Sequence, residues 1–359
     1  MEYTQWIPTP DTIPAPWWLF DVLGGLTFLL HILLVNIVFG AGIVLLFSRI
    51  TGSGPFSEGT FSSGLKKGLP TVLALAITLG IAPLLFIQVV YGHFFYTSSI
   101  VIGQWWMIII PFLMLGYAAL YLHQTQGHKR TTLAVLALVF SLLMFLYLMV
   151  MWVGNVLLHM QPALWAGYFA NASGTLLPFF SADYIPRFLH FLTATIAVGG
   201  LALAVIWWFR DKNNTEARAR KVKTGMRIFA FATIVQILAG FWWLIALPRE
   251  IMLDFMGQSM PHTIVLAIGV VLGLAVLVLS LLGKLWLTVW HLAGTLVVMV
   301  TMRWLLKQSY MAEIFDPGTL EVVPQYDVLA LFLVIFVVGL GTVYWMLKMI
   351  NRAGEGRAA

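Results

Sequence analysis

The chain has 359 residues, of which 61% are hydrophobic, 14% aromatic and only 9% charged. This composition is typical of an integral membrane protein and excludes a water-soluble domain built around one core. The formal net charge of +6 does not indicate nucleic-acid binding. Its basic residues are confined to alternate loops and the C-terminal tail, with four exceptions: Arg187, Arg249, Arg303 and Lys307.

This charge distribution predicts the orientation of the chain. Ten of the 14 acidic residues lie on the side that is poor in Lys and Arg. Because basic loops stay in the cytoplasm, we expect the N-terminus outside and the C-terminus inside. The expected location is the cytoplasmic (inner) membrane of a bacterium or an archaeon.

The sequence contains no Cys. This excludes disulfides, iron–sulfur clusters, thiolate ligands and covalently attached c-type haem. Any haem must therefore be held non-covalently, by His or Met.

Hydrophobic runs predict about nine membrane-spanning helices in an all-α protein, since each run has the roughly 20 apolar residues that a crossing needs. Residues 1–16, with four prolines, form an outer cap. Spans 1 and 5 share a short sequence pattern, which predicts two repeat halves, 17–159 and 187–306. Each half would form a four-helix bundle, and a last helix would follow them. The spans are 17–48, 68–95, 101–123, 131–155, 187–209, 225–247, 262–282, 286–306 and 327–349.

The first and fifth spans share a short pattern. Leu30-His31-x-Leu33-x-x-x-Ile37-x-x-Gly40 matches Leu189-His190-x-Leu192-x-x-x-Ile196-x-x-Gly199. Both spans run from outside to inside, so the echo is consistent with a parallel repeat.

Three histidines, His31, His190 and His291, lie well inside apolar runs. An ionisable side chain at membrane depth is costly and by default indicates function, and imidazole is a common axial ligand of haem iron. The alternative is a buried histidine bonded to a neighbouring carbonyl, and three such positions together favour ligation.

The other histidines lie nearer the helix ends. His93, His159 and His262 are at outer ends, where ligation and bonding to water are equally consistent with the sequence. His123 and His128 lie in a short cytoplasmic loop and are expected to be solvated.

Depth suggests how the ligands pair. Counting about 1.5 Å per residue places His190 near the outer surface, His31 in the middle or outer half of the membrane and His291 nearer the centre. We expect an outer haem on His190, with a sixth ligand from His262, His93, His159 or Met260, and a more central haem on His31, His291 or both.

Charged residues near these positions have expected roles as well. Arg187 and Arg303, or Arg249, are candidates to pair with haem propionates. Glu250, Asp254 and His262 are candidates for proton release from a quinol on the outer side. No span carries a carboxylate away from its ends, so an ion-coupled transport relay has little support.

These residues resemble subunit I of the cytochrome bd quinol oxidases. Three motifs carry the resemblance: His31 with its following glycine, Asn155 followed by Met160-Gln161-Pro162, and Phe188-Leu189-His190 at the start of span 5. His291-Leu292-Ala293-Gly294 is similar to the family's span 8, with His in place of a ligating Glu. The resemblance implies nine spans, an external N-terminus and bound haem.

The departures from that family change the expected activity. Residues 104–123 contain no Asp or Glu, whereas the family has carboxylates there on its proton route. The external quinol loop is reduced to about 249–261. A histidine at position 291 favours a six-coordinate haem suited to electron transfer rather than oxygen binding.

The sequence therefore predicts a membrane cytochrome b with two haem b groups, or three. It would pass electrons between quinol and an outer-side partner, such as a c-type cytochrome, within a respiratory complex in contact with membrane lipid. One alternative is a terminal oxidase of the bd type that reduces oxygen. Another is a haem-free transporter or assembly subunit, whose histidines only bond neighbouring helices.

Overall fold

The chain is a bundle of long helices. A computed structural model describes residues 2–51, 59–126, 131–177, 179, 181–210 and 214–355. Within these ranges, nine helices are long and apolar enough to cross a membrane, and the β pairing is limited to one bridge, between Ile13 and Val322. The prediction of an all-α, multi-pass membrane protein is confirmed.

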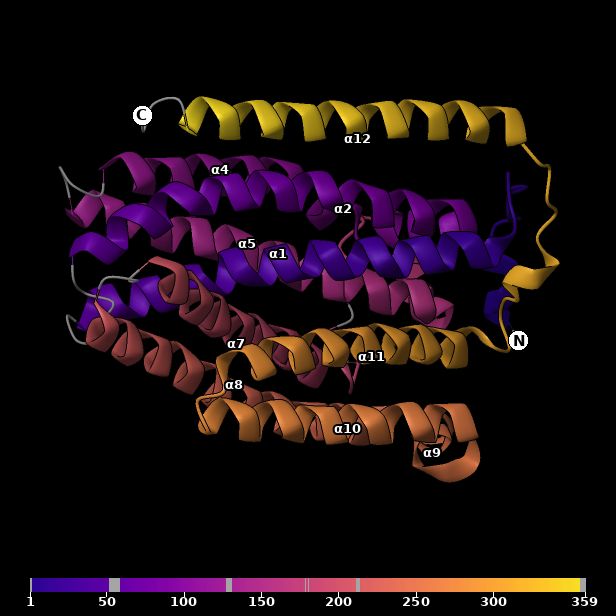
Figure 1. The fold of residues 1–359 in the computed structure, drawn as a ribbon. Coiled ribbons are helices and arrows are strands. Elements are labelled where there is room, and N and C mark those ends of the chain that lie inside the picture. Colours follow the sequence, from indigo (N-terminus) through magenta and orange to yellow (C-terminus); the bar gives the residue numbers. More distant parts are fainter. Residues whose placement is uncertain are drawn as a thin grey trace.

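The first eight spans form two groups of four, and the ninth lies apart (Figure 1). In the first group α1 packs against α2, and α4 against α5; in the second, α7 packs against α8, and α10 against α11. The helices of the first group are α1 Trp17–Thr51, α2 Gly59–Val101, α4 Ile109–Gln126 and α5 Thr131–Met160. Those of the second are α7 Tyr184–Arg210, α8 Thr215–Ala246, α10 Met260–Leu281 and α11 Leu285–Met311.

The last helix, α12 (Tyr326–Glu355), runs along the outside of the first group (Figure 1). Its side chains between residues 326 and 349 are exposed wherever the structure describes them. Because most of them are apolar, lipid is the natural surrounding of this helix.

Short elements fill the connections between the long helices. The N-terminal cap is tied to the connector before α12, since the backbone N–H of Ile13 donates to Glu321 O (2.9 Å) and Val323 N–H donates to Ile13 O (2.9 Å). The short elements are η1 Glu2–Trp6, α3 Gly103–Trp106, η2 Pro162–Trp165, α6 Ala166–Ala170, α9 Arg249–Leu253, the π-helical η3 Asp254–Gln258 and η4 Pro317–Thr319.

The two groups meet where α1 crosses α7. A Cβ added to Gly40 would overlap the carbonyl oxygen of Thr195 and lie 3.0 Å from the Cα of Gly199. Such close approach of two backbones requires glycine on both sides. Beside this crossing, the Thr195 hydroxyl donates to the side-chain oxygen of the buried Asn36 (2.8 Å). Gly40 and Gly199 are the corresponding glycines of the sequence echo.

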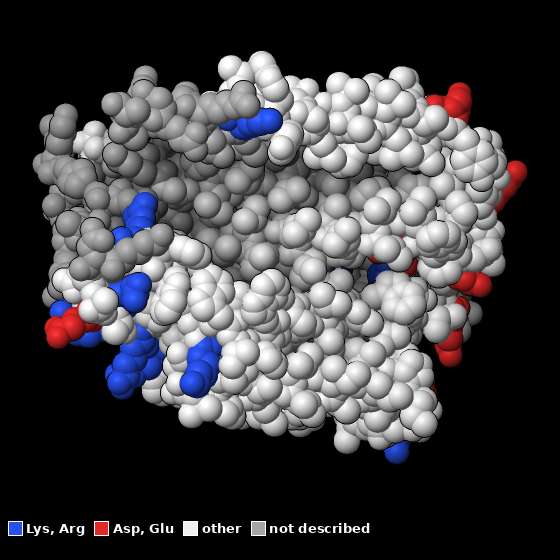
Figure 2. Space-filling view, viewed as in Figure 1, with Lys and Arg blue, Asp and Glu red and all other residues white. Residues whose placement is uncertain are grey.

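Charge separates along the bundle. Figure 2 shows most visible Lys and Arg at the end of the molecule that holds the C-terminus and most visible Asp and Glu at the opposite end. The predicted orientation depends on this separation of charge, and it places the acidic end outside the cell. We refer to this end as the outer end.

Candidate functional site

His190 lies between α7 and α8. Its Nδ1 is 3.1 Å from the carbonyl oxygen of Gln236, and a Cβ added to Gly240 would lie 3.2 Å from the same nitrogen. The carbonyl can only accept, so Nδ1 is the protonated nitrogen and Nε2 keeps its lone pair. Metal-binding histidines are usually oriented by this kind of hydrogen bond.

His31 repeats this arrangement between α1 and α2. Its Nδ1 is 2.8 Å from the carbonyl oxygen of Ala76, and a Cβ added to Gly80 would lie 2.7 Å from its Cε1. In both pairs the glycine follows the carbonyl residue by four positions, on the same helix face. The similarity between spans 1 and 5 therefore includes the contacts of both imidazoles as well as the sequence pattern.

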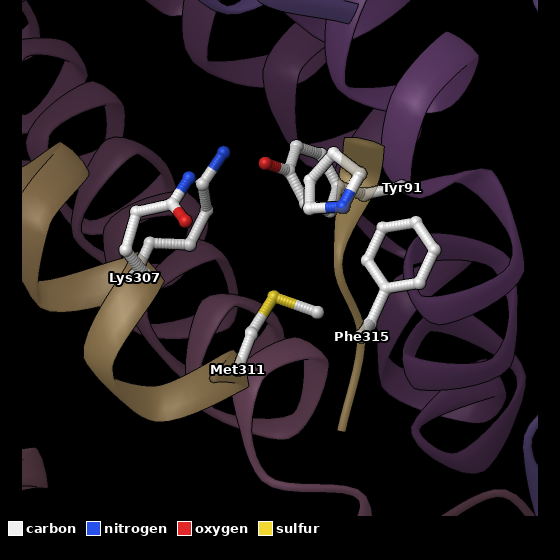
Figure 3. Close-up of a pocket in the computed structure, with 6 residues that line it drawn as sticks. Tyr91, Lys307, Met311 and Phe315 are labelled. Carbon is white, nitrogen blue, oxygen red and sulfur yellow. The ribbon is translucent and has the colours of Figure 1, made fainter. Parts of the chain in front are cut away.

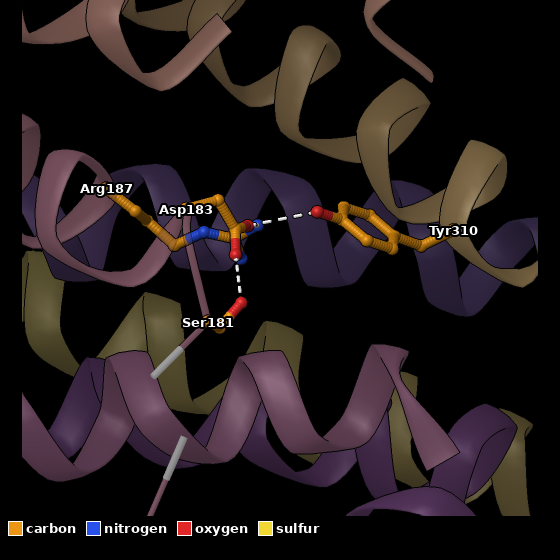
Figure 4. A network of polar contacts seen from close by, with 4 residues as sticks. All are labelled: Ser181, Asp183, Arg187 and Tyr310. Atoms are coloured by element: carbon orange, nitrogen blue, oxygen red, sulfur yellow. Dashed lines mark hydrogen bonds and ion pairs between the residues drawn. The ribbon is translucent and has the colours of Figure 1, made fainter. Parts of the chain in front are cut away.

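A guanidinium lies one helical turn outward from His190. Arg187 is buried and bonds Asp183 Oδ2 through its Nη2 (2.8 Å), and Tyr310 of α11 donates to the same oxygen (3.0 Å). Figure 4 shows this network, in which Ser181 donates to the other carboxylate oxygen (2.6 Å). The network fixes Arg187 beside its histidine.

Two donors next to His190 remain without a partner in the described structure: Arg187 Nε and Trp243 Nε1. The Trp243 ring lies 5.7 Å from the His190 ring and 4.8 Å from the Arg187 guanidinium. Unpartnered buried donors are costly. A haem propionate would satisfy them, so these residues fit the predicted propionate role of Arg187.

A guanidinium of α11 packs on α1, one turn outward from His31. Arg303 of α11 lies over the ring of Phe28, 4.4 Å from its centroid. Phe28 precedes His31 by one turn on α1, so Arg303 contacts the turn of α1 that lies outward from His31. This contact supports the predicted role of Arg303.

His291 lies on α11, near the depth of His31. Its Nδ1 is 2.9 Å from Leu287 O of its own helix. A Cβ added to Gly25 of α1 would lie 3.5 Å from Val300 Cγ1 of α11. Because α1 and α11 run in opposite directions, His31 and His291 lie about 9 and 13.5 Å inward from that contact. A central haem site shared by His31 and His291 is therefore consistent with the structure.

The structure gives the positions of His31 and His190 relative to the crossing of α1 and α7. Each precedes its crossing glycine, Gly40 or Gly199, by nine residues, or about 13.5 Å of helix. The two imidazoles are therefore equally far from the α1–α7 crossing. The structure therefore places His31 and His190 in corresponding positions of the two helix groups.

The sixth ligands predicted for His190 stay predictions, and the structure shows where each of them lies. His262 has both ring nitrogens bonded to hydroxyl groups, Nδ1 to Ser259 (2.7 Å) and Nε2 to Ser309 (3.0 Å). Met260 is exposed at the start of α10. The described contacts of His190 lie on α7 and α8, and they include neither of these residues.

His93 and His159 meet in a different place, among aromatic rings. His159 is 2% exposed, and its ring lies 5.7 Å from Tyr91 and 5.9 Å from Phe94. His93 lies within α2, near the end of the predicted span 68–95, and its ring is 4.8 Å from Phe315. Neither appears among the described contacts of His190, and their assignment as its sixth ligands stays a prediction.

Sequence reasoning missed the ion pair in this cluster. Lys307 Nζ is 3.1 Å from Asp21 Oδ1, and Tyr91 and Trp304 both donate to Asp21 Oδ2 (3.1 and 2.9 Å). Lys307 also lies over the Tyr91 ring, 3.6 Å from its centroid. Figure 3 shows the small pocket beside this pair, bordered by Met311 and Phe315.

A hydrogen-bond chain joins two of the predicted proton-release residues. Ser309 lies between His262 Nε2 (3.0 Å) and Asp254 Oδ2, to which its hydroxyl is 3.3 Å. The structure thus brings Asp254 and His262 together through a residue that the sequence did not single out. Glu250 and Arg249 are exposed nearby, at the start of α9.

The expectation for His123 was wrong. This residue is fully buried in α4, with Nδ1 2.7 Å from Ala134 O, because α4 continues past the predicted boundary and packs on α5. His128 lies outside the described residues.

Among the described residues, no three His, Cys, Asp or Glu side chains gather to hold a metal ion. Haem needs only one or two protein ligands, so the isolated imidazoles are compatible with it. No family model matches the chain, and neither does any curated protein.

Proposed function

We propose that the protein is a haem b-binding subunit of a membrane electron-transfer complex. The observation that supports this most directly is the His190 site, where an oriented imidazole lies beside two unpartnered buried donors, Arg187 Nε and Trp243 Nε1. When bound, a haem would supply one-electron redox chemistry. The residues would hold its iron through His190 Nε2 and its propionate through the two donors.

The corresponding arrangement at His31 supports a second haem. Its imidazole is oriented by Ala76, and Arg303 lies one turn outward. His291, near the same depth on α11, is the candidate for a further ligand. Two b-type haems are therefore proposed, one in each group of four helices.

Quinol is proposed as the electron donor and a c-type cytochrome on the outer side as the acceptor. The chain Asp254–Ser309–His262 supports proton release at the outer end, because it offers a carboxylate and an imidazole joined by a hydroxyl group. Groups within hydrogen-bond reach of one another can pass a proton between them.

The test is a reduced-minus-oxidised spectrum of the purified protein, with haem quantified as pyridine haemochrome. We expect two low-spin b haems per chain, no reaction with carbon monoxide, and loss of one haem in both His190→Ala and His31→Ala. The control is His123→Ala, which removes another buried imidazole bonded to a carbonyl and should keep both haems. A signal that changes with carbon monoxide would favour the oxidase, and a chain without haem would overturn the proposal.

A further inference from the structure

An apolar groove lies between α1, α7 and α8, on the inner side of the His190 site. It has a volume of about 640 Å³. The lining residues are Phe47 of α1, Thr193 and Ile196 of α7, and Thr224, Arg227, Ile228, Phe231, Ala232 and Val235 of α8. Among these Arg227 is the one charged residue, and it lies at the end of the groove nearest the basic surface.

The groove follows one face of α8. Phe231 and Val235 are exposed, so they face lipid. From Arg227 to Val235 the helix rises about 12 Å, a length that suits part of an acyl chain. An extended apolar chain of about this length can therefore contact α8 along the whole of this face.

The same helix face changes from basic to apolar along its length. Arg220, Thr224 and Arg227 follow one another at spacings of four and three residues, and Ile228, Phe231 and Val235 continue the stripe. A phospholipid has this distribution too, with a charged headgroup followed by hydrocarbon. Because the polar end of the groove is cationic, charge complementarity selects an anionic headgroup.

We propose that this groove binds an anionic phospholipid of the cytoplasmic leaflet, with its phosphate at Arg227 and one acyl chain against Ile228, Phe231 and Val235. The site is independent of the proposed function, since it needs no haem. The bound lipid would touch Thr193, one turn from His190, and would therefore border the haem site.

The test is native mass spectrometry of the full-length, delipidated protein, titrated with either phosphatidylglycerol or phosphatidylcholine. We expect the wild type to bind phosphatidylglycerol more tightly than phosphatidylcholine. Arg227→Gln should weaken phosphatidylglycerol binding about fivefold, the effect of one basic residue near an anionic lipid, and leave phosphatidylcholine binding unchanged. Ala232→Phe, which fills the groove and keeps the charge, should weaken the binding of both lipids.

Arg249→Gln is the matched control, because it removes an exposed charge at the outer end. Equal binding of the two lipids to the wild type, or equal effects of Arg227→Gln and Arg249→Gln, would overturn the proposal. So would displacement of the bound lipid by a prenylquinone that binds wild type and Arg227→Gln equally well. Thermal unfolding of each variant shows that it is folded before titration.

Discussion

Gly80 leaves the space that His31 needs to reach the carbonyl of Ala76. In Gly80→Ala, the new Cβ would lie 2.7 Å from Cε1 and 2.8 Å from Nδ1 of the imidazole, which displaces the ring. We expect this variant to lose one haem while remaining folded, as measured by pyridine haemochrome and thermal unfolding. Gly68→Ala, on the same helix with open space around its Cα, should keep both haems. Equal haem content in the two variants would contradict the predicted orientation of His31.

His159 is buried with both ring nitrogens unpartnered among the described residues. An unsatisfied buried polar group costs about 1–3 kcal/mol. His159→Leu removes that cost with a side chain of similar volume, so we expect a gain in stability of this order, measured by thermal unfolding in detergent. A loss of stability would mean that His159 has a partner in the folded protein.

At the scale of residues, sequence reasoning could find single unusual side chains but not their partners. His31 and His190 were identified because each interrupts an apolar run. The pair Asp21–Lys307 was missed, since these residues are 286 positions apart and each looks like an ordinary charge near a helix end. His123 was misassigned because a polar stretch around it suggested a loop where the helix in fact continues.

Among the helices, α1 and α7 make the closest contact. A Cβ on Gly40 has no room, because its neighbours are the backbone atoms of Thr195 and Gly199 rather than flexible side chains. We expect Gly40→Ala to destabilise the protein by about 1–3 kcal/mol or more, as overpacking does, and to lower the thermal midpoint. Gly294→Ala, in open space on α11, should leave it unchanged or raise it. A Gly40→Ala variant as stable as the wild type would show that the two helices are further apart.

Helices were the most predictable feature of the chain. Each of the nine predicted spans corresponds to a helix, because a run of about 20 apolar residues has few other stable arrangements in lipid. Their ends were less predictable. α2 continues past the predicted end at residue 95 to Val101, so His93 lies inside a helix. α5 ends at Met160, so His159 lies at a helix end, where it was expected. Capping and packing determine where a helix ends, and neither can be read from the pattern of apolar residues in the sequence.

For the whole molecule, the separation of charge predicts which end faces the cytoplasm. The protein has no native Cys, so single cysteines can report its orientation. Glu321→Cys lies on an exposed site at the acidic end, and Arg220→Cys on an exposed site at the basic end. The label is a membrane-impermeant maleimide, added to cells whose outer barrier is permeable and whose cytoplasmic membrane is intact. We expect Glu321→Cys to be labelled in these cells, and Arg220→Cys only after the cytoplasmic membrane is permeabilised as well. The reverse pattern would invert the orientation of the chain.

The outer end of α11 bears on how the protein is made. Arg303 and Lys307 each oppose entry of a helix into the bilayer, by about 2.5–3.5 kcal/mol for a basic residue near the centre. Their partners include Asp21 and Phe28 of the first helix, which is synthesised about 280 residues earlier. The eighth helix should therefore enter the membrane stably only when the first is already in place beside the translocation machinery. Insertion of the eighth helix, α11, therefore depends on correct insertion of the first helix, α1.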